Sequence, residues 1–170
     1  MSKKNKNTKI NEFNRRMFIK YGTGAAVVAA SVGLPAPAIH AARKSVKIGF
    51  VSPQTGPLAA FGEADRFVLA DANKALAKGI KIGKRTFPVE ILSRDSQSNP
   101  NRAAEVAAEL ILKQEVNLMI GSSSGDTVNP VSDQAEANEV PCVTADTPWQ
   151  SVYFGRGATP KKGFKWTYHC

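Results

Sequence analysis

A serine-rich loop at residues 121–127, GSSSGDT, combines residue types that suit a binding site. Its small residues allow the backbone to come close to a bound molecule. Its three hydroxyls, together with free backbone N–H groups ahead of a helix, suit an anion such as a carboxylate. Gly and Ser are also ordinary turn residues, so a turn without function is the alternative interpretation.

The same loop satisfies G-x-S-x-G at residues 121–125, the pattern of the nucleophile elbow in serine hydrolases. Ser123 would then be the nucleophile, and Asp146 and His169 follow it in the required order of serine, acid and base. A five-residue pattern arises easily by chance in a serine-rich loop. An exported α/β serine hydrolase is therefore an alternative function rather than the first one.

Other catalytic and metal-dependent chemistry has little support in the sequence. The loop lacks the Lys-Ser/Thr ending of a P-loop, and no G-x-G-x-x-G follows the first predicted strand. No C-x-x-C is present, and His40 lies in a predicted leader, which leaves His169 as the only other histidine. We expect no enzyme activity, no cofactor and no metal site. The spacing of Cys142 and Cys170 leaves their pairing open.

Strands that could position these loops are predicted at residues 45–52, 87–93, 116–120 and 140–144, which are β-rich or apolar runs. Helical patterns separate them, so the sequence predicts an α/β fold with a parallel sheet and flanking helices. Ligands in such sheets bind beyond the carboxyl ends of the strands. Three loops therefore matter, at residues 52–62, 121–129 and 146–150.

The helices are predicted from apolar spacing and from capping residues. The first runs from residue 61 towards Gly79, with apolar residues at positions 64, 68, 72 and 75. The second starts at Asn99-Pro100, an N-cap followed by a first-turn proline, and buries positions 103, 106, 107, 110 and 111. The third is predicted to start at Asn129-Pro130.

The first 42 residues have the pattern of an export signal. Seven Lys or Arg residues up to Lys20 precede an apolar run at residues 21–34, and PAPAIHAA then supplies small residues for a peptidase. This apolar run is shorter than the roughly 20 residues of a membrane span. Residues 14–20, NRRMFIK, resemble the twin-arginine consensus. We therefore expect a twin-arginine signal peptide at residues 1–42 and a periplasmic protein at residues 43–170.

Removing the predicted signal changes the charge of the protein. The whole chain carries a net charge of +9, but residues 43–170 hold 16 basic and 13 acidic residues, a net +3. The remaining basic residues are dispersed and match no nucleic-acid-binding motif. We expect no nucleic-acid partner.

Four segments in a fixed order carry a family resemblance: KIGFVSPQTGPLAAFG at 47–62, SRDSQSNPNRAAEVAAELI at 93–111, VNLMIGSSSG at 116–125 and VPCVTADTPWQ at 140–150. Together they resemble the type I periplasmic binding proteins that serve ABC importers of the branched-chain amino acid class. The resemblance implies a two-lobed protein that closes on a small solute, an amino acid or a similar carboxylate or amide, and delivers it to a membrane permease.

The resemblance also implies which residues contact the solute. Loops like these hold the α-carboxylate and amino group of the ligand through hydroxyls and main-chain groups. Ser122, Ser123 and Ser124 become candidates for the carboxylate, and Asp146 and Thr147 for the second contact. Further candidates are Phe61 and Trp149, as walls for the apolar part of the ligand or as core residues, and Gln54, at the edge of the cleft.

The length of the chain sets a further expectation. Residues 43–170 amount to 128 residues and correspond to the first lobe, with the second lobe and the hinge missing. We expect this piece to form one wall of a cleft and to bind ligand weakly or not at all by itself. A ligand-sensing domain of a receptor with the same fold is a further alternative.

Overall fold

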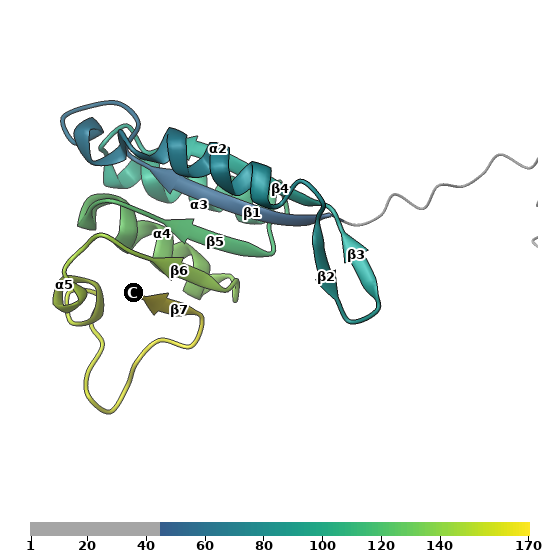
Figure 1. Cartoon of the computed structure of the whole chain (residues 1–170). Helices are drawn as coiled ribbons and strands as arrows, with labels where there is room; N and C mark the ends of the chain where they lie inside the picture. The colour runs from purple at the N-terminus through teal and green to yellow at the C-terminus, as the bar shows by residue number, and fades with distance from the viewer. Residues whose placement is uncertain (1–44) are drawn as a thin grey trace, which may run out of the picture. The chain divides into compact units, whose positions relative to one another are not determined.

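A five-stranded parallel sheet forms the centre of residues 45–170, the residues described by the computed structural model (Figure 1). Its strand order is β4-β1-β5-β6-β7, and every neighbouring pair is parallel. The strands are β1 (Val46–Ser52), β4 (Val89–Asp95), β5 (Leu118–Gly121), β6 (Cys142–Thr144) and β7 (Thr167–His169). The predicted α/β fold with a parallel sheet is confirmed. The export signal predicted at residues 1–42 lies outside the described residues.

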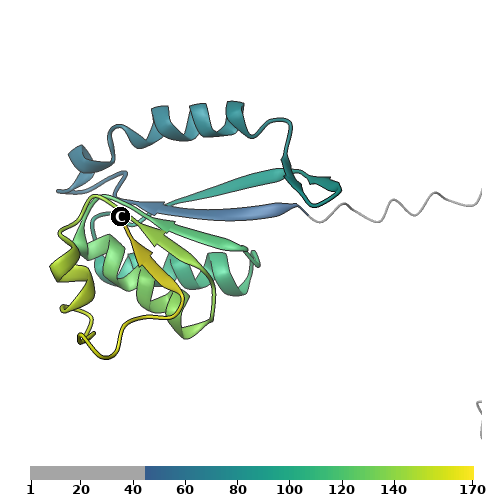
Figure 2. The same ribbon diagram turned by 60° about the horizontal axis from the view of Figure 1, so that its bottom comes forward.

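Helices lie on both sides of this sheet. Helix α2 (Asp65–Ala75) lies on one face, and α3 (Pro100–Leu112) and α4 (Gly125–Ala137) lie on the other (Figure 2). A 3₁₀ helix, η1 (Ala59–Gly62), precedes α2, and a short helix, α5 (Trp149–Tyr153), follows β6. Within residues 45–170, no helix has the length and apolar character needed to span a bilayer.

Three of the observed strands were not predicted. Strands β2 (Ile80–Ile82) and β3 (Arg85–Phe87) form an antiparallel hairpin between α2 and β4. Strand β7 pairs with β6 near the end of the chain. All three strands are only three residues long, too short for a periodic pattern to stand out.

Helix α3 follows its prediction closely. The Asn99 side chain accepts hydrogen bonds from the backbone N–H groups of Asn101 (2.9 Å) and Arg102 (3.0 Å), and Pro100 occupies the first turn. An N-cap of this kind satisfies donors that have no partner inside the helix. All five positions predicted to be apolar and inward-facing are buried: Ala103, Val106, Ala107, Leu110 and Ile111.

The predicted start of α4 at Asn129-Pro130 was wrong. The helix begins at Gly125, with Ser124 as its N-cap and Pro130 inside it. Pro130 has no N–H to donate to the carbonyl four residues earlier, which normally disfavours a helix interior. The loss is confined to the second turn, while Val128 and Val131 on the same helix are fully buried. Tertiary packing of the helix thus outweighs the local preference.

The apolar face predicted for the first helix is not buried in this chain. Of the four predicted positions on this face, Val68 is 54% exposed, Ala64 and Ala75 are exposed and Ala72 is half-buried. The main core lies on the opposite side of the sheet, where α3 and α4 cover β1, β5 and β6. It contains Val51, Val106, Leu110, Met119, Val131 and Cys142.

Candidate functional site

The carboxyl ends of β1, β5 and β6 lie side by side and bring two of the predicted loops together. Val51 of β1 is in register with Gly121 of β5, which is in register with Thr144 of β6. The loop after β5 and the loop after β6 therefore leave the same edge of the sheet. This is the edge where parallel sheets bind ligands.

A chain of hydrogen bonds joins these two loops. The Ser122 hydroxyl donates to Oδ2 of Asp146 at 3.2 Å, and the Ser122 and Ser123 hydroxyl oxygens lie 3.0 Å apart. An ionised carboxylate only accepts hydrogen bonds, so the Ser122 proton is directed to Asp146 and the Ser123 hydroxyl donates to Ser122. Both serines are buried, whereas Asp146 is exposed. The arrangement leaves the outer side of the Asp146 carboxylate open to a cation.

The backbone conformation is unusual at Ser123 and Asp146, the two ends of this series of hydrogen bonds. Ser123 has φ of 88° and Asp146 has φ of 63°, in the region that residues other than glycine seldom adopt. Such conformations cost free energy and persist where the surrounding contacts impose them. Two of the six described non-glycine residues with positive φ therefore lie on these two facing loops.

The N-terminus of α4 supplies donors next to the same serines. Ser124 is its N-cap, but the Ser124 side chain makes no capping hydrogen bond. A Cβ atom placed on Gly125 would meet nothing within 4 Å, so the space beside this first turn is open. Unpaired N–H groups and the helix dipole favour an anion at such a position. Asp126 in the same turn is an exposed competitor for these donors.

Thr147 makes a hydrogen bond through its backbone carbonyl and not through its hydroxyl. The Thr147 Oγ1 atom is buried without a hydrogen-bond partner in residues 45–170. Its carbonyl oxygen lies 2.7 Å from Nε2 of His169, while Nδ1 of His169 lies 2.8 Å from the Thr144 hydroxyl. A carbonyl only accepts, so Nε2 carries the proton in the neutral ring and Nδ1 accepts from Thr144.

The hydrolase interpretation needed His169 against Ser123, and this contact is not formed. Both ring nitrogens of His169 are engaged with Thr144 and Thr147. The Ser123 hydroxyl bonds to Ser122 instead. Ser123 does have the strained backbone of an elbow serine, but no base within the described chain hydrogen-bonds to it.

Gln54 is held by hydrogen bonds to the neighbouring strand β4. Its side-chain Nε2 donates to the Ser93 hydroxyl at 2.8 Å, and its backbone N–H donates to Oδ1 of Asp95 at 2.9 Å. It also lines a surface hollow with residues of η1. The sequence analysis did not identify Asp95 as part of this structure.

Asp95 holds the loop after β1 in place. Its Oδ1 accepts from the amides of Gln54, Thr55 and Gln97, and its Oδ2 accepts from the Thr55 hydroxyl at 2.6 Å. Burial alone would raise the pKa of Asp95, but the Thr55 hydroxyl and the three amides together lower it below its usual value. Gly56 follows with φ of 88°, and a Cβ there would lie 2.7 Å from Ser98 Oγ.

The two predicted apolar walls are exposed in this chain. Phe61 in η1 is 64% exposed and Trp149 at the start of α5 is 55% exposed. Trp149 packs near Phe154, with ring centroids 5.7 Å apart. It also borders a cavity of about 530 Å³ beside β7, together with Tyr153, Arg156, Phe164, Tyr168 and His169. Neither residue belongs to the main core.

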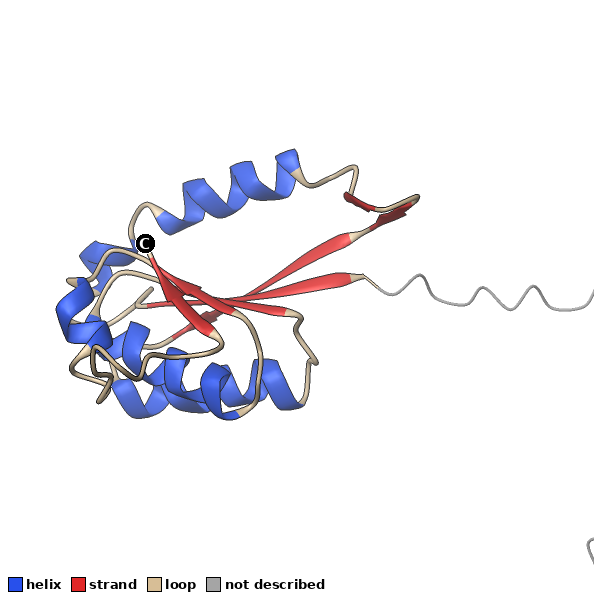
Figure 3. Ribbon diagram, turned by 90° about the horizontal axis from the view of Figure 1, so that it is seen from below, coloured by secondary structure: helices blue, strands red, loops and turns tan. Residues whose placement is uncertain are grey.

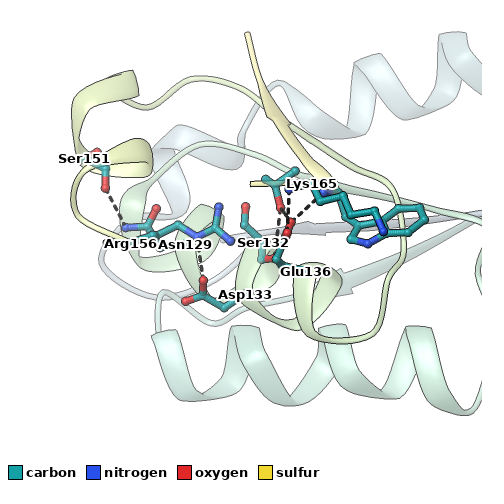
Figure 4. Close-up of polar contacts among 9 residues, drawn as sticks. Asn129, Ser132, Asp133, Glu136, Ser151, Arg156 and Lys165 are labelled. Carbon is teal, nitrogen blue, oxygen red and sulfur yellow. Dashed lines mark hydrogen bonds and ion pairs between the residues drawn. The ribbon is translucent and has the colours of Figure 1, made fainter. Parts of the chain in front are cut away.

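Glu136 and Arg156, which the sequence analysis missed, hold the segment that leads to β7 (Figure 4). Glu136 of α4 accepts from the backbone N–H groups of Lys165 (2.7 Å) and Trp166 (2.8 Å). Burial alone would raise the pKa of Glu136, but these hydrogen bonds lower it. Arg156 donates to Asp133 at 2.7 Å and stacks on Phe164. These contacts set where β7, and hence His169, lies.

The buried carboxyl of Asp65 lies near the candidate site. Burial raises the pKa of Asp65 above its usual value, the nearby Ser52 hydroxyl opposes the rise and the charge of Asp146 adds to it. Neither Asp65 Oδ2 nor Ser52 Oγ has a hydrogen-bond partner among the described residues. Both atoms are closed off from solvent, so they are not available to a ligand in this conformation.

The two cysteines are not joined. Cys142 in β6 is buried and Cys170 is exposed, and both thiols are free. Burial raises the pKa of the Cys142 thiol to about 12, so this thiol stays protonated and unreactive. Within residues 45–170, no three side chains of His, Cys, Asp or Glu converge as metal ligands.

Solved structures share this fold. The leucine-binding protein LivK from Thermotoga maritima is 28% identical and aligns with a TM-score of 0.59 over 73% of this chain and 32% of its own. LivJ from Streptococcus pneumoniae, a branched-chain amino acid transporter substrate-binding protein in complex with isoleucine, is 22% identical, with a TM-score of 0.58 over 74% of this chain and 33% of its own. An extracellular ligand-binding receptor from Rhodopseudomonas palustris is 27% identical, with a TM-score of 0.56 over 74% of this chain and 31% of its own.

The chain spans about one third of the length of these solved proteins. No curated protein sequence matches it. The sequence profile of the periplasmic binding protein family matches residues 45–170, the whole of the described sheet and its helices. The chain therefore belongs to the periplasmic binding protein family.

Proposed function

We propose that this chain is the first lobe of the solute-binding component of an ABC importer, and that the solute is an amino acid or a closely similar small molecule. The observation that carries the proposal is the meeting of the loops after β5 and β6, where Ser122 bonds to Asp146 beside the open N-terminus of α4. The protein acts by binding and not by catalysis.

The chemistry of this edge favours a solute with both charges. The open N-terminus of α4 suits a carboxylate, while the exposed side of Asp146 suits an ammonium group. Because the Ser122 proton is directed to Asp146 and the Ser123 proton to Ser122, the carboxylate of the solute would rely on backbone N–H groups and on Ser124. LivK, named as a leucine-binding protein, supports an amino acid as the solute.

Direct ligand binding tests this proposal on the full-length protein. Thermal shift with the twenty common amino acids, and with small amides and organic acids, should identify at least one amino acid that raises the melting temperature, since a ligand of the folded state stabilises it. Absence of stabilisation by every amino acid and related compound would overturn the proposal.

Matched variants locate the site. Asp146→Asn should weaken binding of the stabilising amino acid about tenfold or more, because it removes the charge that faces the ammonium group. Asp71→Asn on α2 is the control, since Asp71 is an exposed carboxylate paired with Lys74 on the same helix. Equal effects of the two substitutions would exclude Asp146 from the site.

We also propose that residues 1–42 direct export through the twin-arginine route, which places the protein in the periplasm with an inner-membrane ABC permease as its partner. Arg15 and Arg16 ahead of the apolar run motivate this part. Replacing both with Lys should keep the precursor in the cytoplasm, measured by cell fractionation. Undiminished export of the double variant would exclude this route.

A further inference from the structure

The turn after β6 has little backbone support of its own. Ala145 N–H donates to the Gly121 carbonyl at a long 3.3 Å, and Asp146 then adopts its positive φ of 63°. Among the described residues, the Thr147 carbonyl has one hydrogen-bond partner, the His169 ring at 2.7 Å. A strained turn with so few contacts needs an outside group to hold it.

His169 reaches this turn from the neighbouring strand. It is the last residue of β7, in register with Thr144, the last residue of β6. The Thr144 hydroxyl lies 2.8 Å from Nδ1, so it occupies one side of the ring while the other side faces the Thr147 carbonyl. The ring therefore bridges the end of β6 and the turn three residues later.

We propose that His169 is a positioning residue of the candidate site: its Nε2–H holds the Thr147 carbonyl and thereby keeps the Asp146 carboxylate against Ser122. The inference rests on the proposed function only for the identity of the bound solute, and the positioning role of His169 does not depend on it. It assigns His169 a role that differs from that of a hydrolytic base, because both of its nitrogens serve backbone and threonine partners. The Glu136 contacts that place β7 are part of the same support.

Two substitutions separate positioning from packing. His169→Gln retains a donor and an acceptor on one planar group, so it can bond to the Thr147 carbonyl and accept from Thr144. His169→Phe retains the planar ring but removes both hydrogen bonds. Tyr168→Phe, on the exposed side of the same strand, is the matched control.

The first measurement is hydrogen–deuterium exchange of the full-length protein without ligand, followed by mass spectrometry. His169→Phe should increase deuterium uptake in the peptide covering residues 144–150, whereas His169→Gln and Tyr168→Phe should match the wild type. Unchanged uptake in His169→Phe would overturn the proposal. Increased uptake spread over β5, β6 and β7 with a lower melting temperature would also overturn it, since that result means a general structural role.

The second measurement is binding of L-leucine, L-isoleucine and L-valine by isothermal titration. For any of these that the wild type binds, His169→Phe should raise Kd by about five- to tenfold, because the hydrogen bond to the Thr147 carbonyl is lost, and His169→Gln by no more than about twofold. A Kd unchanged in His169→Phe would overturn the link to the site. If the wild type bound none of the three probes and failed the wider amino-acid panel, the proposed function would fail while the exchange result still decided the role of His169.

Discussion

Helix α2 lies on one face of the central sheet, and α3 and α4 lie on the other, as the edge-on view shows (Figure 3). The side chains on these two faces differ in how completely they are buried. Alternate residues of each strand point to opposite faces. On the face covered by α3 and α4 the apolar residues of β1, β5 and β6 are fully buried and Leu92 of the edge strand β4 is half-buried, whereas on the α2 face most are half-buried, with Phe50 as a buried exception. The fully buried set is Val51, Met119 and Cys142, and the half-buried set is Ile48, Ile91, Ile120 and Val143.

This difference indicates where the stability of the chain comes from. Removing apolar surface from water contributes about 25 cal/mol per Å², so the fully buried face contributes more per residue. The candidate site lies at the carboxyl ends of β5 and β6, next to the N-terminus of α4, which covers the well-packed face. The turns with positive φ at Ser123 and Asp146 thus lie next to the better-packed face of the sheet.

The largest expected loss of stability comes from a comparison of the two faces on one strand, β5. Met119→Ala should lower the free energy of unfolding by about 3 kcal/mol, because it opens a cavity under α3 and α4. Ile120→Ala, the next residue of β5 on the other face, should cost about 1 kcal/mol. Urea denaturation of this chain measures both, and equal costs would remove the proposed difference between the faces.

A smaller loss of stability is expected from Glu136, the carboxylate on α4 that accepts hydrogen bonds from the segment before β7. Glu136→Gln should lower the free energy of unfolding by about 1.5 kcal/mol, because the neutral amide accepts more weakly from Lys165 and Trp166. Glu105→Gln on α3, an exposed residue paired with Arg102, should change it by less than about 0.5 kcal/mol. The same denaturation experiment applies, and similar losses for the two variants would show that β7 does not depend on this anchor.

The pH dependence of the free energy of unfolding tests Asp95 together with Glu136. Both Asp95 and Glu136 have pKa values below their usual ones when the chain is folded. Their contribution to stability is therefore complete above the unfolded pKa values of about 4, and it is lost as the pH falls through the folded values. Between about pH 5 and about pH 3, the wild type should lose more stability than the Asp95→Asn/Glu136→Gln double variant. Parallel pH profiles would contradict the role of these carboxylates.

The smallest effect is expected on α2. Phe67→Ser should change the free energy of unfolding of this chain by less than about 0.5 kcal/mol, because the side chain is already 71% exposed. Thermal denaturation followed by circular dichroism measures it. A loss comparable with that of Met119→Ala would mean that the α2 face contributes as much as the packed face.

Much of the fold was predictable from the sequence because the signals are local. Helix α3 shows its cap, its first-turn proline and its apolar spacing within one stretch of chain. The alternation of strands and helices then implied the parallel sheet. The prediction failed at Pro130, where a local breaker lies inside α4, and on α2, whose apolar spacing does not correspond to burial here.

The sequence by itself determined the fold class, the family resemblance and the loops that meet at the carboxyl edge of the sheet, because strand direction alone brings such loops together. Only the tertiary structure decided which side chains contact one another there. The Ser122–Asp146 bond joins residues 24 positions apart, the Gln54–Ser93 bond 39, and the His169–Thr147 contact 22. Such contacts depend on strand order and register, which no local pattern specifies.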